Sequence, residues 1–243
     1  MSCYGNCRAN DQLDARTALL KPKVVDPDCS SPFKVYKVVV FGEPVSGKTE
    51  LSRQISKPQS QFKQRYRTTI GVDFTIRTIP DYLLPPRDER TSTNAVVQFW
   101  DIGAHAEGFR LRMLTRQTDT CFVVVDPTST VSLGDQLTRT LSQVVPYLDD
   151  DVTVLIVTSK ADLQRCNPTL EDVRALVPDE HRGRILGCYS TSAADGSGCE
   201  ELFADLCRHM ITQQMNRARR GARPGAVRLP PLNEQVKRKP GCR

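Results

Sequence analysis

The sequence predicts an α/β fold in which a mostly parallel, six-stranded sheet carries helices on both faces. Two observations lead to this prediction. Short apolar segments alternate with helix-like segments between residues 33 and 215, and such alternation is typical of parallel sheets. A phosphate-binding sequence also follows the first apolar segment directly, at the carboxyl end of a strand, where ligands bind in sheets of this kind.

Six segments are short, apolar and rich in β-branched or aromatic residues, so we predict that they form the strands. They are Val35–Phe41, Phe74–Ile79, Val96–Trp100, Cys121–Asp126, Val152–Val157 and Ile185–Tyr189. Apolar residues at helical spacing predict two amphipathic helices. One apolar face consists of Leu137, Leu141, Val144, Val145 and Leu148, and the other of Leu202, Phe203, Leu206 and Met210.

Composition divides the chain into three parts. Residues 1–32 are polar and without a sustained period, which predicts a disordered N-terminal extension. Residues 33–215 form the folded domain, within which the charged and proline-rich segment 80–93 is expected to be an enlarged surface loop, with disorder. Residues 216–243 hold nine basic residues and one acidic residue, a net of +8, so the other residues sum to +6 − 8 = −2. A basic tail on an acidic domain argues against a nucleic-acid-binding fold, which would carry its basic residues on the domain.

Cysteine usage and hydropathy favour a cytoplasmic protein. No apolar run approaches the roughly 18–20 residues that span a bilayer, and the N-terminus lacks the apolar core of a secretory signal. The cysteines number nine, an odd count without regular spacing. Cys121 and Cys188 lie in apolar runs, so we expect reduced, buried thiols and a reducing compartment.

Residues 42–49, Gly-Glu-Pro-Val-Ser-Gly-Lys-Thr, match the phosphate-binding loop G-x-x-x-x-G-K-[ST]. The glycines allow the backbone N–H groups to surround a phosphate, and the following helix adds positive partial charge. Lys48 would reach the β- and γ-phosphates, and the Thr49 hydroxyl would hold Mg²⁺. The phosphate-binding residues predicted in this loop are Gly42, Val45, Ser46, Gly47, Lys48 and Thr49.

A second group of residues points to guanine. Asp162 follows the apolar strand Val152–Val157, and its carboxylate can accept hydrogen bonds from guanine N1–H and the exocyclic amine, which adenine does not offer. The Lys160 stem can lie across the base. After the last predicted strand, the segment 190–194 can donate backbone N–H groups to the guanine oxygen. The predicted guanine-binding residues are Ser159, Lys160, Asp162, Ser192, Ala193 and Ala194.

With these motifs in their order, the chain resembles a Ras-superfamily small GTPase of the Rab type over residues 33–215. Residues 69–79 are similar to the Rab first switch and the strand after it, and Phe99-Trp100-Asp101 to the segment before the second switch. The resemblance implies that Thr69 and Asp101 hold Mg²⁺ with Thr49, and that Gly103 and Ala104 lie at the γ-phosphate. It also implies an effector surface of Ile70, Gly71, Phe74 and Trp100. GTP or GDP with Mg²⁺ would be the ligands, and exchange factors, GTPase-activating proteins and effectors the partners.

The second switch departs from the family at the site of hydrolysis. The family has Trp-Asp-Thr-Ala-Gly-Gln-Glu where this chain has Trp-Asp-Ile-Gly-Ala-His-Ala-Glu at residues 100–107. Without a gap, His105 replaces the catalytic glutamine; with one inserted residue, Ala106 replaces it. Because that glutamine positions the attacking water, either alignment predicts weak intrinsic GTP hydrolysis, and both alignments stay open.

Further departures affect the phosphate loop, the base site and the effector surface. Pro44 removes one N–H donor from the loop, next to the γ-phosphate. Ser159 stands where the family has asparagine, so its contact with the phosphate loop is in doubt. Ala194 replaces a lysine that packs near the base, and Leu114 occupies the third aromatic position of the Rab effector surface.

The tail ends with Cys242 beside a basic cluster, whereas Rab proteins typically end in paired, prenylated cysteines. A single lipid with basic residues can hold a protein on an anionic membrane, so lipidation at Cys242 would place the protein on the cytosolic face of an endomembrane. A solvated tail with a free thiol is the alternative. For function, the main prediction is a GTP-hydrolysing switch in membrane traffic. The alternatives are a non-hydrolysing GTP-binding scaffold and an ATP-dependent phosphotransferase.

Overall fold

A computed structural model describes residues 34–58, 62, 67–84, 95–163 and 168–221. The predicted N-terminal extension, most of the predicted loop 80–93, and Cys242 lie outside these residues. Of the loop, Asp81–Leu83 forms a short 3₁₀ helix, η1.

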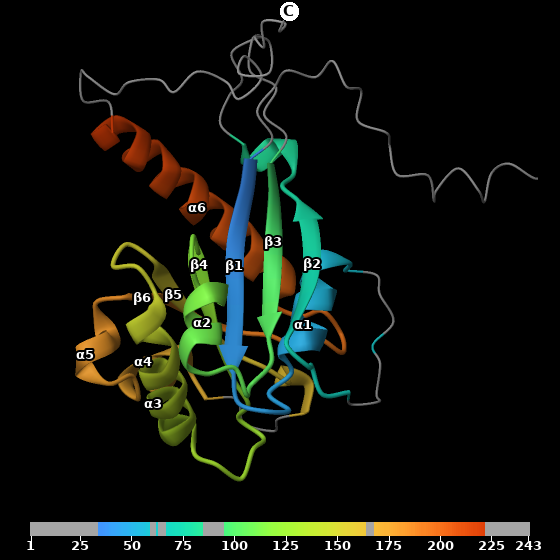
Figure 1. Cartoon of the computed structure of the whole chain (residues 1–243). Helices are drawn as coiled ribbons and strands as arrows, with labels where there is room; N and C mark the ends of the chain where they lie inside the picture. The colour runs from blue at the N-terminus through green and yellow to red at the C-terminus, as the bar shows by residue number, and fades with distance from the viewer. Residues whose placement is uncertain (1–33, 59–61, 63–66, 85–94, 164–167, 222–243) are drawn as a thin grey trace, which may run out of the picture.

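The six predicted strands are all present and form one sheet (Figure 1). Their order in the sheet is β2-β3-β1-β4-β5-β6, and every neighbouring pair is parallel except the antiparallel pair β2–β3. The prediction of a mostly parallel six-stranded sheet is therefore confirmed. The strands are β1 (Lys34–Gly42), β2 (Val72–Thr78), β3 (Ala95–Ile102), β4 (Thr120–Val125), β5 (Thr153–Thr158) and β6 (Ile185–Ser190).

Helices cover both faces of this sheet and enclose two apolar clusters (Figure 1). One cluster lies under α1 and α6, and the other lies under α2, α3 and α4. The α-helices are α1 (Lys48–Ser56), α2 (Gly108–Leu114), α3 (Leu133–Val144), α4 (Leu170–Ala175), α5 (Asp179–Arg182) and α6 (Cys199–Gly221), with the 3₁₀ helices η2 (Val145–Tyr147) and η3 (Ala161–Leu163).

Strand β1 shows why its sequence is a continuous apolar run. Val38 and Val40 point into the α1–α6 cluster, whereas Val39 and Phe41 point into the opposite cluster. Because successive side chains alternate between the faces and both faces are covered, a polar residue would be buried at any of these positions.

The predicted apolar face from Leu137 to Leu148 is buried, but it is not one α-helix. Helix α3 ends at Val144, and Val145–Tyr147 continues as the 3₁₀ helix η2. Pro146 explains the change, because it has no N–H to donate and its ring clashes with the preceding helical turn. Val145 and Leu148 nevertheless remain in the same apolar cluster.

Helix α6 buries Leu202, Phe203, Leu206 and Met210, as predicted. The helix continues to Gly221, past the domain boundary expected at residue 215. Near its end, the Arg217 guanidinium contacts the carboxylates of Asp119, at 3.4 Å, and Asp151, at 2.7 Å. Both acids precede strands, so this part of α6 lies at the amino ends of β4 and β5.

Within the described residues, no helix is both long enough and apolar enough to cross a membrane.

The cysteines of the described residues are buried, unpaired thiols, as predicted for Cys121 and Cys188. Burial raises the pKa of Cys121 to about 12. A thiol with so high a pKa is unreactive at neutral pH.

Lys37, on β1, connects the sheet to the end of α2 through hydrogen bonds. Its ammonium donates to the carbonyl oxygens of Leu114 (2.6 Å) and Arg116 (2.8 Å), and it lies 3.7 Å from the ring centre of Trp100. Burial lowers the pKa of Lys37 to about 8, against the opposing attraction of Asp119.

This lowered pKa predicts how stability depends on pH. Between about pH 8 and 10.5 the unfolded chain holds the Lys37 proton more tightly than the folded chain. The free energy of unfolding of the wild type should therefore rise with pH relative to that of Lys37→Met, by at most about 1.4 kcal/mol per pH unit. Urea unfolding at several pH values measures this difference. The matched change at exposed Lys57, Lys57→Met, serves as the control. A difference for Lys37→Met that varies with pH no more than that of the control would contradict the prediction.

Candidate functional site

Most of the residues that the motifs single out line one cavity of about 1200 Å³; Gly42, Ser46, Asp101, Ala106 and Ser192 are not among its lining residues. It lies at the carboxyl ends of the parallel strands, as expected for this type of sheet. Its walls come from the phosphate loop, the segment before β2, the loop after β3, and the loops after β5 and β6. The volume exceeds the roughly 300–1,000 Å³ of ordinary small-molecule pockets, so a nucleotide with its metal ion fits.

The phosphate loop begins where β1 passes very close to β4. A Cβ atom on Gly42 would lie 2.3 Å from the carbonyl oxygen of Val124, so only glycine fits there. The loop then leads into α1, whose first residue, Lys48, is buried. The Lys48 ammonium donates to the carbonyl oxygens of Gly42 (3.0 Å) and Glu43 (2.7 Å). Burial lowers the pKa of Lys48 to about 8.

Two residues inside the loop lower the stability of the folded domain, one through backbone strain and one through an unpaired hydroxyl. Val45 has a φ of 63°, in the left-handed region that a β-branched side chain rarely adopts. The hydroxyl of Ser46 is buried without a hydrogen-bond partner among the described residues. Both positions are unspecified in the phosphate-loop motif, so neither feature can be predicted from it.

Two hydroxyls and one carboxylate meet at the predicted metal site. The hydroxyl oxygens of Thr49 and Thr69 lie 3.0 Å apart. Both groups donate to Oδ2 of Asp101, with a distance of 3.2 Å from Thr69. Thr49 comes from α1, Thr69 from the segment before β2, and Asp101 from β3, so the fold unites three distant parts of the sequence.

These residues fit a magnesium ion. Mg²⁺ prefers oxygen ligands and binds through one or two carboxylates together with phosphates and water. Asp101 is buried, which raises the pKa of its carboxyl, and its Oδ1 has no hydrogen-bond partner among the described residues. A buried carboxylate oxygen left without a donor is the kind of ligand that a cation would complete.

The segment before β2 and the loop after β3 touch at Gly103. Its N–H donates to the carbonyl oxygen of Gly71 at 2.9 Å. A Cβ atom on Gly103 would lie 2.5 Å from the carbonyl oxygen of Thr69, so the contact requires glycine. Gly103 and Ala104 both line the cavity beside Thr69.

Across the cavity, Lys160 and Asp162 occupy the predicted base site. The Lys160 ammonium pairs with Oδ2 of Asp126 at 2.6 Å. Burial alone would raise the pKa of Asp126, but hydrogen bonds from Lys160 and Thr128 lower it below its ordinary value. Asp162 is exposed, and its Oδ1 accepts a hydrogen bond from the Ser192 hydroxyl at 2.6 Å. The Asp162 carboxylate is thus oriented by the loop that follows β6.

Ser192 and Ser159 differ in what they connect. The buried Ser192 hydroxyl also accepts a hydrogen bond from the N–H of Ala194 at 3.2 Å, and Ala193 and Ala194 line the cavity. The Ser159 hydroxyl donates to the carbonyl oxygen of Val125 at 3.2 Å. The Ser159 side chain lies near Gly47 of the phosphate loop: a Cβ atom built on Gly47 would be 3.5 Å from the Ser159 Cβ.

The two candidates for the missing glutamine lie in different places. His105 is exposed and lines the cavity. Ala106 is 6% exposed and packs in the apolar cluster beneath α2 and α3, while its N–H donates to the carbonyl oxygen of Gly103 at 3.0 Å. Of these two residues, only His105 lines the cavity.

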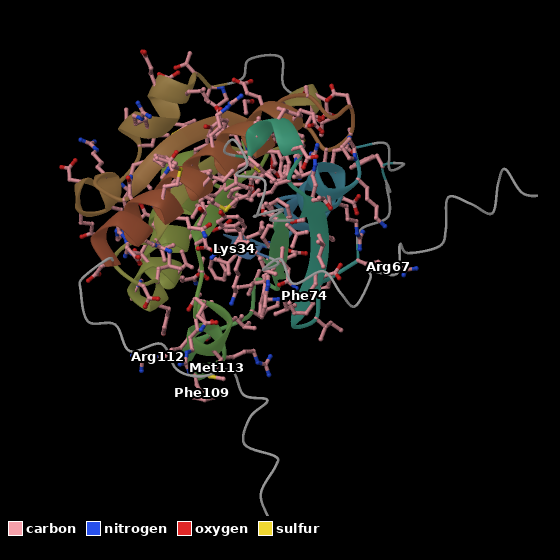
Figure 2. The ribbon with its side chains drawn as sticks, turned by 90° about the horizontal axis from the view of Figure 1, so that it is seen from above. Lys34, Arg67, Phe74, Phe109, Arg112 and Met113 are labelled. Atoms are coloured by element: carbon pink, nitrogen blue, oxygen red, sulfur yellow. The ribbon has the colours of Figure 1, made fainter. Side chains whose placement is uncertain are left out.

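The predicted effector surface lies beside the cavity. Ile70 is 94% exposed and, with Gly71, precedes β2. On β2 and β3, Phe74 meets Trp100 edge to face, with ring centres 4.7 Å apart. Figure 2 shows the Phe74 side chain at the surface of the sheet.

Comparison with known proteins agrees with this geometry. The sequence model of the Ras family matches residues 37–212. The Ras-related protein Rab-4 of Dictyostelium discoideum is 30% identical over 186 residues, which cover 75% of this chain and 82% of the relative. The Ras-related protein RABD2a of Arabidopsis thaliana is 27% identical over 216 residues, with 86% and 95% covered. The dog protein Rab-25 is 27% identical over 202 residues, with 80% and 85% covered.

The strained conformation of Val45 yields a prediction about stability. Val45→Gly should raise the free energy of unfolding by about 1 kcal/mol, since relief of the left-handed strain exceeds the entropy that glycine adds to the unfolded chain. This corresponds to a rise in melting temperature of about 2–4 °C for a domain of this size. Val45→Ala keeps a Cβ atom at the same φ and serves as the control; an equal rise in both variants would contradict the role of strain.

Proposed function

Because the chain belongs to the Ras family of small GTPases and resembles its Rab members, we propose that it binds GTP and GDP with Mg²⁺ in this cavity. The observation that carries the proposal is that Lys48, Thr49, Thr69 and Asp162 border a single space, with the buried Asp101 carboxylate hydrogen-bonded to both threonines. Each group recognises a different part of the ligand: phosphate, metal ion and guanine.

The chain's own residues would divide the work as follows. Lys48 and the N–H groups of the phosphate loop bind the phosphates. Thr49, Thr69 and Asp101 hold Mg²⁺, which neutralises phosphate charge when bound. Asp162 accepts hydrogen bonds from guanine N1–H and the exocyclic amine, and Ser192 keeps the carboxylate in position. An adenine nucleotide lacks these donors, which disfavours the ATP-dependent phosphotransferase.

The contact between Gly103 and the segment around Thr69 supports a switch. A γ-phosphate beside Gly103 and a metal ion on Thr69 would hold both segments together, and loss of that phosphate would release them. Exchange factors and effectors distinguish the two states only through contacts that differ between them. The surface of Ile70, Gly71, Phe74 and Trp100 adjoins these segments and is where we place the effectors.

Weak intrinsic hydrolysis is the part of the proposal that separates an enzyme from a scaffold. Because Ala106 is buried and His105 lines the cavity, we propose His105 as the residue near the attacking water. Imidazole can hydrogen-bond to water, but it does not offer the acceptor and donor pair of a glutamine amide. Pro44 adds a second restriction, because it removes an N–H donor from the loop that a GTPase-activating protein would approach. A GTP-binding scaffold that does not hydrolyse remains the second candidate for this reason.

We place the switch in membrane traffic, because the chain resembles Rab proteins over nearly its whole domain. The basic tail with Cys242 would carry it to an anionic membrane on the cytosolic side.

The first test pairs GTP binding with single-turnover hydrolysis. The wild type should bind GTP in preference to ATP and hydrolyse it about tenfold or more slowly than His105→Gln, because glutamine restores the group that positions water. Lys48→Ala should abolish binding. Ala106→Gln should not accelerate hydrolysis and should lower the free energy of unfolding by about 1–3 kcal/mol, since its side chain has no room in the core.

The outcomes distinguish the candidates. Single-turnover hydrolysis by the wild type at an ordinary Rab-like rate, unchanged by His105→Gln, would contradict weak intrinsic hydrolysis. Tight GTP binding without turnover in either protein would favour the scaffold, and preference for ATP would reject the guanine site.

The second test concerns the membrane. Native protein should carry a lipid on Cys242, visible as added mass, and should sediment with vesicles that contain phosphatidylserine. Cys242→Ser should lose both properties while nucleotide binding stays intact. An unmodified Cys242 in the native protein would refute the lipid anchor.

A further inference from the structure

Helix α2 exposes two large apolar side chains on one face. Phe109 is 79% exposed and Met113 is 50% exposed, and residues four apart lie one above the other on a helix. Leu111 between them is buried and holds the helix on the domain. Figure 2 shows Phe109, Arg112 and Met113 together at the outer edge of the molecule, directed away from the sheet.

Three arginines lie close to this apolar pair in the sequence, and no carboxylate among the described residues pairs with them. Arg110, Arg112 and Arg116 are exposed, and none of them forms an ion pair with another residue in the described part of the chain.

The neighbouring charged groups do not neutralise these arginines. Lys37 adds a fourth cation at the end of α2. Glu107 precedes the helix, and its side chain forms no cap on it. Asp119 accepts from the N–H of Lys37 and contacts Arg217, so its carboxylate is already engaged.

We propose that the α2 patch, defined as Phe109, Arg110, Arg112, Met113 and Arg116, binds an acidic amphipathic segment of a partner protein. Apolar side chains of that segment pack on Phe109 and Met113, and its carboxylates pair with the guanidinium groups, which bind carboxylates in bidentate fashion. Buried apolar anchors surrounded by complementary charge are the usual composition of a binding hot spot.

A protein partner fits this patch better than a membrane surface. Helices that lie in a membrane interface bury a broad apolar face, whereas α2 spans seven residues and turns Leu111 toward the core. Two exposed apolar side chains suffice for a protein hot spot. The proposal rests on the proposed function, because α2 follows the His105 loop and would move with the nucleotide state.

A random peptide library selected on the full-length protein tests the proposal. The protein is loaded with Mg²⁺ and a non-hydrolysable GTP analogue, and peptides that also bind R110E/R112E/R116E are removed. We expect the enriched peptides to combine Asp or Glu with Leu, Phe or Trp. Their affinity should fall about tenfold or more in Phe109→Ala and in Arg112→Glu and should weaken with salt. The control Arg182→Glu, on α5, should leave it unchanged.

The possible results are decisive. Enriched peptides without acidic residues, or no selective enrichment, would overturn the proposal, as would arginine-dependent binding to phosphatidylserine vesicles without peptide selection. Guanine-nucleotide binding by the same preparations is measured separately. Failure of nucleotide binding would refute the proposed function, whereas intact nucleotide binding without acidic peptides would refute the α2 patch alone.

Discussion

The close approach of Gly42 to the backbone of β4 is the constraint on which the site depends. A side chain at this position would collide with the carbonyl oxygen of Val124, so glycine alone lets β1 end beside β4 and turn into the phosphate loop. The turn brings Lys48 and Thr49 to the edge where the other strands end. Asp101 and Asp162 reach the same edge because parallel strands share it.

The loop built on this constraint combines stabilising and unfavourable features. The stabilising feature is the Lys48 ammonium, which donates hydrogen bonds to two carbonyl oxygens of the loop. The unfavourable features are the left-handed φ of Val45 and two buried oxygens without hydrogen-bond partners among the described residues, the Ser46 hydroxyl and Asp101 Oδ1. Such features are common at functional sites, where ligand contacts supply what the protein lacks. The site is thus shaped more for ligand binding than for the stability of the domain.

The fold followed from the sequence because its signals were strong. Continuous apolar runs identified the strands that are buried on both faces, and the phosphate-loop motif located the cavity. Other features depend on tertiary packing: the burial of Ala106 in the apolar cluster beneath α2 and α3 has no sign in the sequence around it. The φ of Val45 and the unpaired arginines of α2 have no local signature at all. The end of α3, by contrast, does have a local signature in the sequence, because Pro146 interrupts the apolar helical pattern.

The two ends of the parallel strands contact different parts of the protein. Residue Arg217 holds the last helix against acids that precede β4 and β5, whereas the cavity opens where these strands finish. The last part of α6 therefore lies at the end of the sheet remote from the cavity (Figure 1). A protein tethered through its C-terminal residues would present the cavity and its adjoining loops outward, away from the surface that holds it, and open to partners that arrive from solution.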